Sequence, residues 1–190
     1  TRRGARRAPL APLALIAVIA LAAGLLLERT GLAGLGGAPS RAAASLRFSE
    51  VQNNNTFTLV SRDGATPAWI EIENMGAQPV SLHGLGLARD DKVNKIFVFP
   101  DITLGAGEFI LVYADDTARA GLSGELHAPF GLSSAGGQTL ILFDNAQNLL
   151  DSVTLPRMDA DESYCRGENG EWSVSVQATP GAANDLVADR

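Results

Sequence analysis

The sequence predicts an all-β domain preceded by one transmembrane helix. From Leu46 onward, short apolar runs recur at roughly 8 to 12 residue spacing, and Gly, Pro, Asn and Asp separate them. This pattern is typical of many short strands in a β-sandwich or barrel. No stretch after Ser45 places apolar residues at helical spacing, whereas residues 10–27 form an unbroken apolar run.

The N-terminal segment is long enough to span a bilayer. Residues 10–27, LAPLALIAVIALAAGLLL, contain no charge, and four arginines occur within residues 1–9. A helix that rises about 1.5 Å per residue would carry this run across most of a hydrocarbon core of about 30 Å. Because Arg-rich flanks stay on the cytoplasmic side, we expect residues 1–9 to be a cytoplasmic basic flank and the rest to be extracytoplasmic.

Signal cleavage is the alternative. Ala42, Ala43 and Ala44 before Ser45 form a small-residue site, and cleavage there would give a secreted protein. Two features favour an uncleaved, single-pass signal anchor: the apolar run exceeds the usual signal core of about 7 to 15 residues, and the alanines lie far beyond its end. Residues 28–45, rich in Gly and Ala, are then a flexible linker.

Charge argues against nucleic acid as a partner. Six arginines and one glutamate give residues 1–45 a net charge of +5, and since the whole chain carries −6, residues 46–190 carry −11. Binding to phosphate backbones depends on Lys and Arg. The charge therefore argues against a nucleic-acid partner, whereas membrane contact through residues 10–27 is expected.

Eight segments are predicted to be strands. They are residues 46–51, 68–73, 79–82, 95–100, 108–114, 138–144, 149–155 and 171–176. The dense apolar runs in 95–100, 108–114 and 138–144 indicate central strands, and the sparser runs indicate sheet edges. In residues 68–73, alternation places Ile70 and Ile72 on one face and Trp69, Glu71 and Glu73 on the other.

Glu71 and Glu73 are the strongest candidates for chemistry. Two carboxylates on one strand face can act as acid and base or hold a cation. The structural alternatives are an outward polar face, or a hydrogen bond between Glu71 and a loop backbone, and we favour these. The sequence therefore assigns no catalytic, cofactor-binding or metal-binding residue and predicts no enzyme.

Other reactive residue types give weaker signals. Cys165 is the only cysteine, which excludes an internal disulfide, and a buried structural thiol is the favoured interpretation. His83 and His127 lack a Cys or carboxylate at ligand spacing. The acidic clusters do not match the Asp-x-Asp-x-Asp-Gly calcium loop and are interpreted as solvated; they are Asp90–Asp91, Asp115–Asp116 and Asp159–Glu162.

Five segments, in order, resemble a bacterial lamin tail domain over residues 46–184. They are FSEVQNNN, PAWIEIENMGAQPVSLHGLGLA, FVFPDITLGAGEFILVYA, LHAPFGLSSAGGQTLILFDNAQNLLDSV and SYCRGENGEWSVSVQATPGAAN. The resemblance implies an immunoglobulin-like β-sandwich that is not catalytic, with residues 185–190 as a polar tail. It also implies that Ile70 and Ile72 face the core, while Trp69 covers the sheet near its edge with the glutamate heads in solvent.

The implied function is a membrane-anchored interaction module. Such a module would bind a protein or a cell-envelope polymer through loops at one end of the sandwich or through an edge strand. In bacterial relatives the domain is often joined to enzymes, so an accessory or targeting module for a secreted hydrolase or kinase-like enzyme is the alternative. A calcium-dependent adhesion domain is a third hypothesis. The chain has no heptad rod and no C-terminal Cys-a-a-X box, so filament formation is not implied.

Overall fold

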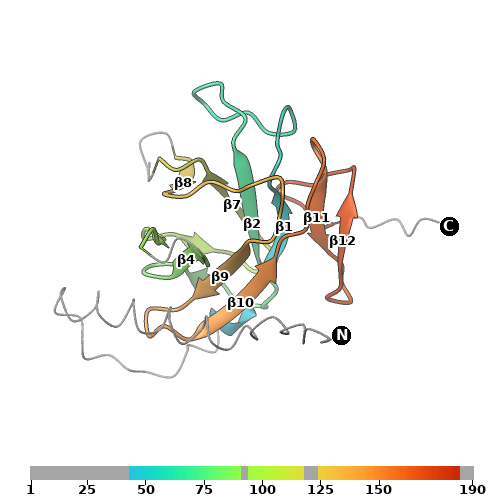
Figure 1. Cartoon of the computed structure of the whole chain (residues 1–190). Coiled ribbons are helices and arrows are strands. Elements are labelled where there is room, and N and C mark those ends of the chain that lie inside the picture. Colours follow the sequence, from blue (N-terminus) through green and yellow to red (C-terminus); the bar gives the residue numbers. More distant parts are fainter. Residues whose placement is uncertain (1–42, 91–93, 118–123, 185–190) are drawn as a thin grey trace, which may run out of the picture. The chain divides into compact units, whose positions relative to one another are not determined.

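The computed structural model describes residues 43–90, 94–117 and 124–184 (Figure 1). Within these residues, one 3-10 turn, η1 (Ala43–Ser45), leads into twelve β-strands. The all-β prediction is therefore confirmed. No helix in this part of the chain is long and apolar enough to cross a membrane. The predicted basic flank (1–9), transmembrane helix (10–27), most of the linker (28–42) and polar tail (185–190) lie outside the described residues.

The larger sheet has six strands in the order β12-β11-β1-β2-β7-β8. Neighbours are antiparallel except β7 and β8, which are parallel. A bulge in β1 between Phe48 and Glu50 shifts its register against β2. The strands are β1 (Leu46–Gln52), β2 (Ala68–Asn74), β7 (Phe109–Ala114), β8 (Leu126–Ala128), β11 (Ser163–Arg166) and β12 (Trp172–Ser175).

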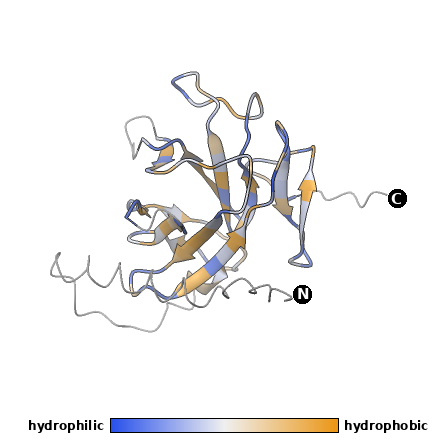
Figure 2. Ribbon diagram, viewed as in Figure 1, coloured by the Kyte–Doolittle hydropathy of each residue, from blue (hydrophilic) through white to orange (hydrophobic). Residues whose placement is uncertain are grey.

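The smaller sheet has four strands in the order β10-β9-β4-β5, and β3 pairs separately with β6. These strands are β3 (Val80–Ser81), β4 (Gly86–Arg89), β5 (Phe97–Val98), β6 (Thr103–Leu104), β9 (Thr139–Phe143) and β10 (Leu149–Thr154). The apolar core draws on both sheets (Figure 2). Phe48, Ile70 and Ile72 belong to the six-stranded sheet, whereas Leu87 and Leu142 belong to the four-stranded one. The predicted core position of Ile70 and Ile72 is confirmed.

The placement of several strands differs from the sequence prediction. The dense run 95–100 gives only the two-residue edge strand β5, whereas the sparse runs 46–51 and 68–73 give β1 and β2 in the middle of a sheet. The sequence also missed β4, β6, β8 and β11. β4 begins at Gly86, where an added Cβ would lie 2.2 Å from the Phe143 ring, so a glycine that suggests a turn allows close packing inside a sheet.

Candidate functional site

The face of the six-stranded sheet that carries Glu71 is covered by residues 177–184. Residues 177–184, the C-terminal strap, follow β12. Glu71 is 0% exposed and accepts hydrogen bonds from the Ser49 hydroxyl (2.5 Å) and from the Gly181 backbone N–H. The expected hydrogen bond between Glu71 and a loop backbone is confirmed. The expectation that the glutamate heads lie in solvent is wrong for Glu71. Trp69, which was expected to cover the sheet near its edge, lies on the central strand β2, is fully buried and donates its indole N–H to Gln52.

Burial governs the chemistry of this carboxyl. It raises the pKa of Glu71 to about 7, although the Ser49 and Gly181 donors act in the opposite direction. Glu73 instead forms a salt bridge of 2.9 Å with Arg47. The two carboxylates that the sequence paired as candidate acid and base therefore have different partners.

Glu50 and Cys165 complete the contacts beneath the strap. Glu50 accepts hydrogen bonds from the Thr179 backbone N–H (3.0 Å) and from the Cys165 thiol (3.1 Å). Asn184 donates to the backbone carbonyls of Ser49 and Arg166. Burial, together with the nearby Glu50, raises the pKa of Cys165 to about 12, although the hydrogen bond with Ser163 acts in the opposite direction. The thiol is buried as predicted, and a group that holds its proton this firmly is a poor nucleophile.

The two histidines lie in different surroundings. His83 is exposed, whereas His127 is buried on β8 with its Nδ1 2.8 Å from Asp115 Oδ2 and its Nε2 3.7 Å from Glu125 Oε2. Sequence spacing did not reveal this contact, because the parallel pairing of β7 with β8 brings His127 beside Tyr113, close to Asp115. Across the described ranges, no group of three or more His, Cys, Asp or Glu residues is arranged to hold a metal ion.

Asp161 fixes the loop between β1 and β2. Its carboxylate accepts backbone N–H groups from Thr56 (2.8 Å) and Phe57 (3.0 Å) and hydroxyl groups from Thr56 and Thr58. Slight burial raises the pKa of Asp161, but these donors outweigh it and lower the pKa to about 2. The sequence placed this residue in a solvated acidic cluster, and it missed that the carboxylate binds a loop more than a hundred residues away.

The same loop, residues 53–67, is braced at its base and presents apolar side chains at its tip. Asn55 donates to the carbonyls of Leu59 (2.7 Å) and Pro67 (2.8 Å), so its amide ties the two ends of the loop together. Phe57 nevertheless remains 75% exposed and Val60 59% exposed. The loop therefore exposes the Phe57 side chain to solvent, while hydrogen bonds restrain its backbone.

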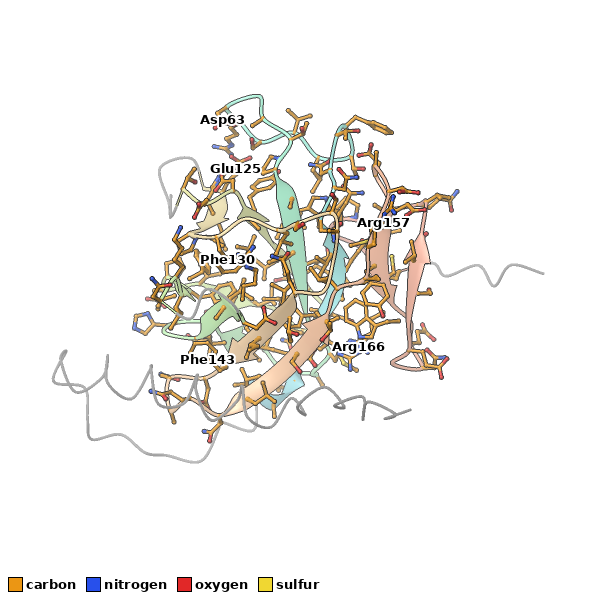
Figure 3. The ribbon with its side chains drawn as sticks, in the orientation of Figure 1. Asp63, Glu125, Phe130, Phe143, Arg157 and Arg166 are labelled. Atoms are coloured by element: carbon orange, nitrogen blue, oxygen red, sulfur yellow. The ribbon has the colours of Figure 1, made fainter. Side chains whose placement is uncertain are left out.

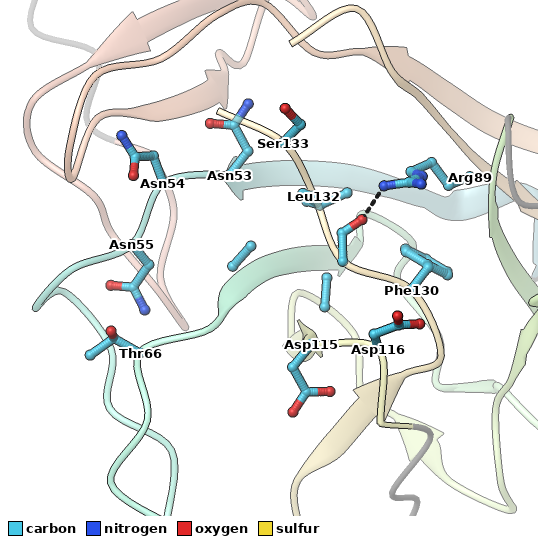
Figure 4. A pocket seen from close by; sticks show the side chains of 13 residues that line it. Asn53, Asn54, Asn55, Thr66, Arg89, Asp115, Asp116, Phe130, Leu132 and Ser133 are labelled. Atoms are coloured by element: carbon cyan, nitrogen blue, oxygen red, sulfur yellow. Dashed lines mark hydrogen bonds between the residues drawn. The ribbon is translucent and has the colours of Figure 1, made fainter. Parts of the chain in front are cut away.

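A hollow of about 470 Å³ opens beside this loop (Figure 4). Its wall includes Asn53–Asn55, Thr66 and Ser133, with Asp115 and Asp116 across from them. Asn53 is 5% exposed, and its side-chain oxygen has no hydrogen-bond partner among the described residues. Figure 3 shows Asp63 and Glu125 at the same end, where both Glu125 oxygens accept the Arg62 backbone N–H at 3.2 Å. We call the 53–67 loop and the hollow the loop end.

Comparison with known proteins supports the sandwich. Residues 39–157, more than half of the chain, match the family model of the Lamin Tail Domain. The chain belongs to this family. Lamin tail domains are immunoglobulin-like modules of the protein-interaction type, and the two sheets agree with that fold. β11, β12 and the C-terminal strap lie beyond the match.

Solved structures are also similar to this lamin tail domain. A DUF4876 family protein from Bacteroides thetaiotaomicron is 11% identical, with a TM-score of 0.41, over 77% of this chain and 73% of that chain. No curated protein matches.

Proposed function

We propose that this protein is a non-catalytic interaction module, anchored in the cell membrane by residues 10–27, whose extracytoplasmic lamin tail domain binds another protein through the loop end. The observation that carries the proposal is Phe57, an aromatic side chain 75% exposed on a loop that Asp161 and Asn55 hold in one conformation. Aromatic residues dominate binding energy at protein interfaces. A loop that is already ordered loses little conformational entropy on binding.

Charge and exposed apolar side chains indicate what kind of protein surface would fit the loop end. Residues 46–190 carry a net charge of −11, whereas Phe57 and Val60 provide an uncharged contact at the loop tip. A partner with an apolar pocket rimmed by basic groups would match both features. If that partner is a hydrolase or kinase-like enzyme, the module is its accessory or targeting subunit.

A cell-envelope polymer is the second candidate ligand, because of the hollow. Side chains of Asn, Asp, Thr and Ser line it, and these types offer both donors and acceptors to neutral hydroxyl groups. The Asn53 side-chain oxygen is a buried acceptor for one more donor. A polysaccharide would use this wall instead of the apolar loop tip.

Crosslinking of the full-length protein in its native membrane, followed by mass spectrometry, tests the proposal. We expect one recurrent exported partner, linked near residues 53–67. Phe57→Ala should reduce its capture at least about tenfold, as expected for an aromatic hot spot. Val98→Ala is the matched control, since Val98 is also exposed (57%) but lies on β5.

Two other outcomes would overturn the proposal, the first for the loop tip as the binding surface and the second for a protein as the ligand. If Phe57→Ala and Val98→Ala capture the same partner equally, the loop tip is not the binding surface. If the protein captures only itself, its binding to purified envelope polysaccharides is measured, with Asn54→Ala as the variant in the hollow. Loss of polysaccharide binding in that variant, with Phe57→Ala unchanged, would establish the second candidate.

A further inference from the structure

The six-stranded sheet ends at β12, whose described strand neighbours lie on one side only. Figure 1 shows β12 at the margin of the sheet, beyond β11. The hairpin that joins these strands indicates which backbone groups face outward. Gly167 donates its N–H to the Glu171 carbonyl (2.8 Å), and Arg166 then pairs with Trp172, Cys165 with Ser173 and Tyr164 with Val174.

Hydrogen-bonded and non-hydrogen-bonded pairs alternate along an antiparallel ladder. Because the Gly167–Glu171 pair is hydrogen-bonded, the Cys165–Ser173 pair is as well, and the pairs of Trp172 and Val174 are not. Trp172 and Val174 therefore turn their N–H and C=O groups away from β11. Among the residues that the structure describes, these four groups form the free edge of the sheet.

The side chains on this edge alternate between apolar and small polar. Trp172 and Val174 share one face, where Trp172 stacks on Tyr164 with ring centroids 4.9 Å apart. Val174 remains 44% exposed, and Ser173 and Ser175 occupy the opposite face. Edge strands are usually protected from pairing by Lys, Pro, a bulge or an inward charge. Residues 172–177 contain no Lys, no Pro and no charge.

We propose that β12 is a self-association edge: it pairs antiparallel with β12 of a second copy of this chain, about a two-fold axis through Ser173. In this register Trp172 lies opposite Val174 of the second copy, and Val174 opposite its Trp172. Both pairs are hydrogen-bonded, so all four outward groups of each copy are used. Each pair also joins an aromatic to a β-branched side chain, which is a favourable cross-strand combination.

The edge fits a second copy better in this register than in the neighbouring one. An axis through Val174 would place Trp172 opposite Val176, but the strand ends at Ser175 and the chain bends at Val176. An axis through Ser173 uses only residues with strand geometry. Charge permits the contact, since Glu171 would face Ser175 of the second copy and no like charges would be opposed. A two-fold interface of this kind closes after two copies and leaves no new edge.

Engineered disulfides test the axis directly. At a non-hydrogen-bonded antiparallel pair the Cα atoms are about 4.5 Å apart, which lies within the disulfide range of about 4.4 to 6.8 Å. The full-length chain would carry Cys165→Ser, because Cys165 is the register partner of Ser173 within the same copy. In that background Ser173→Cys should form a covalent dimer under mild oxidation. Ser175→Cys is the control, since the proposed register separates the two Ser175 residues by about 13 Å.

A charge at the edge provides the second test. Val174→Lys, added to the Ser173→Cys chain, should reduce the crosslinked fraction at least about tenfold. Each copy would then place one lysine opposite Trp172 of the other copy, and a lysine on an edge strand opposes pairing. Val176→Lys adds the same charge outside the paired residues and should leave the crosslink unchanged. Equal crosslinking at positions 173 and 175, no crosslink at 173, or equal effects of the two lysines would each overturn the proposal. Unchanged thermal unfolding of the reduced variants shows that the fold is intact.

Discussion

Two carboxylates accept backbone hydrogen bonds from distant segments of this chain, but one is buried and the other is close to solvent. Glu71 accepts the Gly181 N–H beneath the C-terminal strap and is 0% exposed. Asp161 accepts the Thr56 and Phe57 N–H groups at the loop end, close to solvent. Each carboxylate therefore holds a distant segment in place by accepting its backbone N–H groups. The pKa of Glu71 nevertheless rises to about 7, whereas that of Asp161 falls to about 2.

Solvation explains the difference. A buried carboxylate loses hydration that two donors do not replace, so Glu71 retains a proton to higher pH. Asp161 keeps some solvent access and receives more donors, so its charged form is favoured. A hydrogen bond from a backbone N–H therefore does not by itself determine the charge of its acceptor. The strap is held by a carboxyl that resists ionisation, and the loop end by one that is always charged at neutral pH.

Removal of Glu71 should give the largest effect. Glu71→Ala leaves the Gly181 N–H and the Ser49 hydroxyl without their acceptor and opens a small cavity, which together cost about 2–4 kcal/mol. Urea unfolding followed by the fluorescence of buried Trp69 measures the loss. Glu73→Ala is the matched control, and because Glu73 and Arg47 keep part of their solvent contact, loss of their ion pair should cost less, on the order of 1–2 kcal/mol. Equal losses would show that burial does not distinguish the two glutamates.

The pH dependence of stability should differ in sign between the two carboxyls. Glu71 has a folded pKa of about 7, above its ordinary value of 4.5, so its contribution is fully present below pH 4.5 and is lost as the pH rises through 7. The free energy of unfolding should fall over this range by on the order of 3 kcal/mol, since one pKa unit corresponds to about 1.4 kcal/mol. Glu71→Gln, which cannot titrate, should flatten the slope between pH 4.5 and 7. An unchanged slope would assign it to other groups.

Asp161 should show the opposite behaviour. Its folded pKa of about 2 lies below its ordinary value of 3.8, so its contribution is present above pH 3.8 and is lost as the pH falls through 2. At neutral pH, Asp161→Asn should therefore lower the free energy of unfolding and speed hydrogen exchange at the Thr56 and Phe57 amides. Asp159→Asn is the control, because Asp159 is largely exposed and contacts Arg157 at 3.4 Å. Equal exchange in both variants would show that Asp161 does not hold the loop.

Calcium removal should give the smallest effect. Several acidic groups of the loop end already have protein partners: Asp116 pairs with Lys95, and Asp115 with His127. We expect a chelator to leave the Tm of the full-length protein unchanged. A reproducible decrease in Tm, restored by added calcium but not by magnesium, would instead support the calcium-dependent adhesion hypothesis.

The sequence was most informative where local pattern decides structure. Alternation in residues 68–73 correctly placed Ile70 and Ile72 in the core, because successive strand residues point to opposite faces. It could not reveal what covers the other face, since the Gly181 amide that meets Glu71 lies 110 positions away. The polar residues of β1 and β2 therefore suggested exposed edges, although these strands are central.

The candidate site was harder to predict, because its contacts are not local. The residues NNNT (53–56) that follow β1 are typical of a turn, but nothing in them shows that Asp161 binds Thr56 or that Phe57 remains exposed. The free edge at β12 was foreseen only in general terms, as one of two possible working surfaces. Its register depends on the pairing of β12 with β11, a strand that the sequence did not reveal.

By itself, the sequence determined the strand-rich class, the acidic charge of residues 46–190, the family resemblance and the faces of β2. Charge follows from composition alone, and the strand pattern and its faces follow from the alternation of neighbouring residues. The tertiary structure alone decided which carboxyl is buried, which loop is fixed and which strand forms the edge. All three features depend on contacts between segments that are distant in the sequence. In this β-sandwich such contacts exclude water from Glu71, which raises its pKa, and bring hydrogen-bond donors to Asp161, which lowers its pKa.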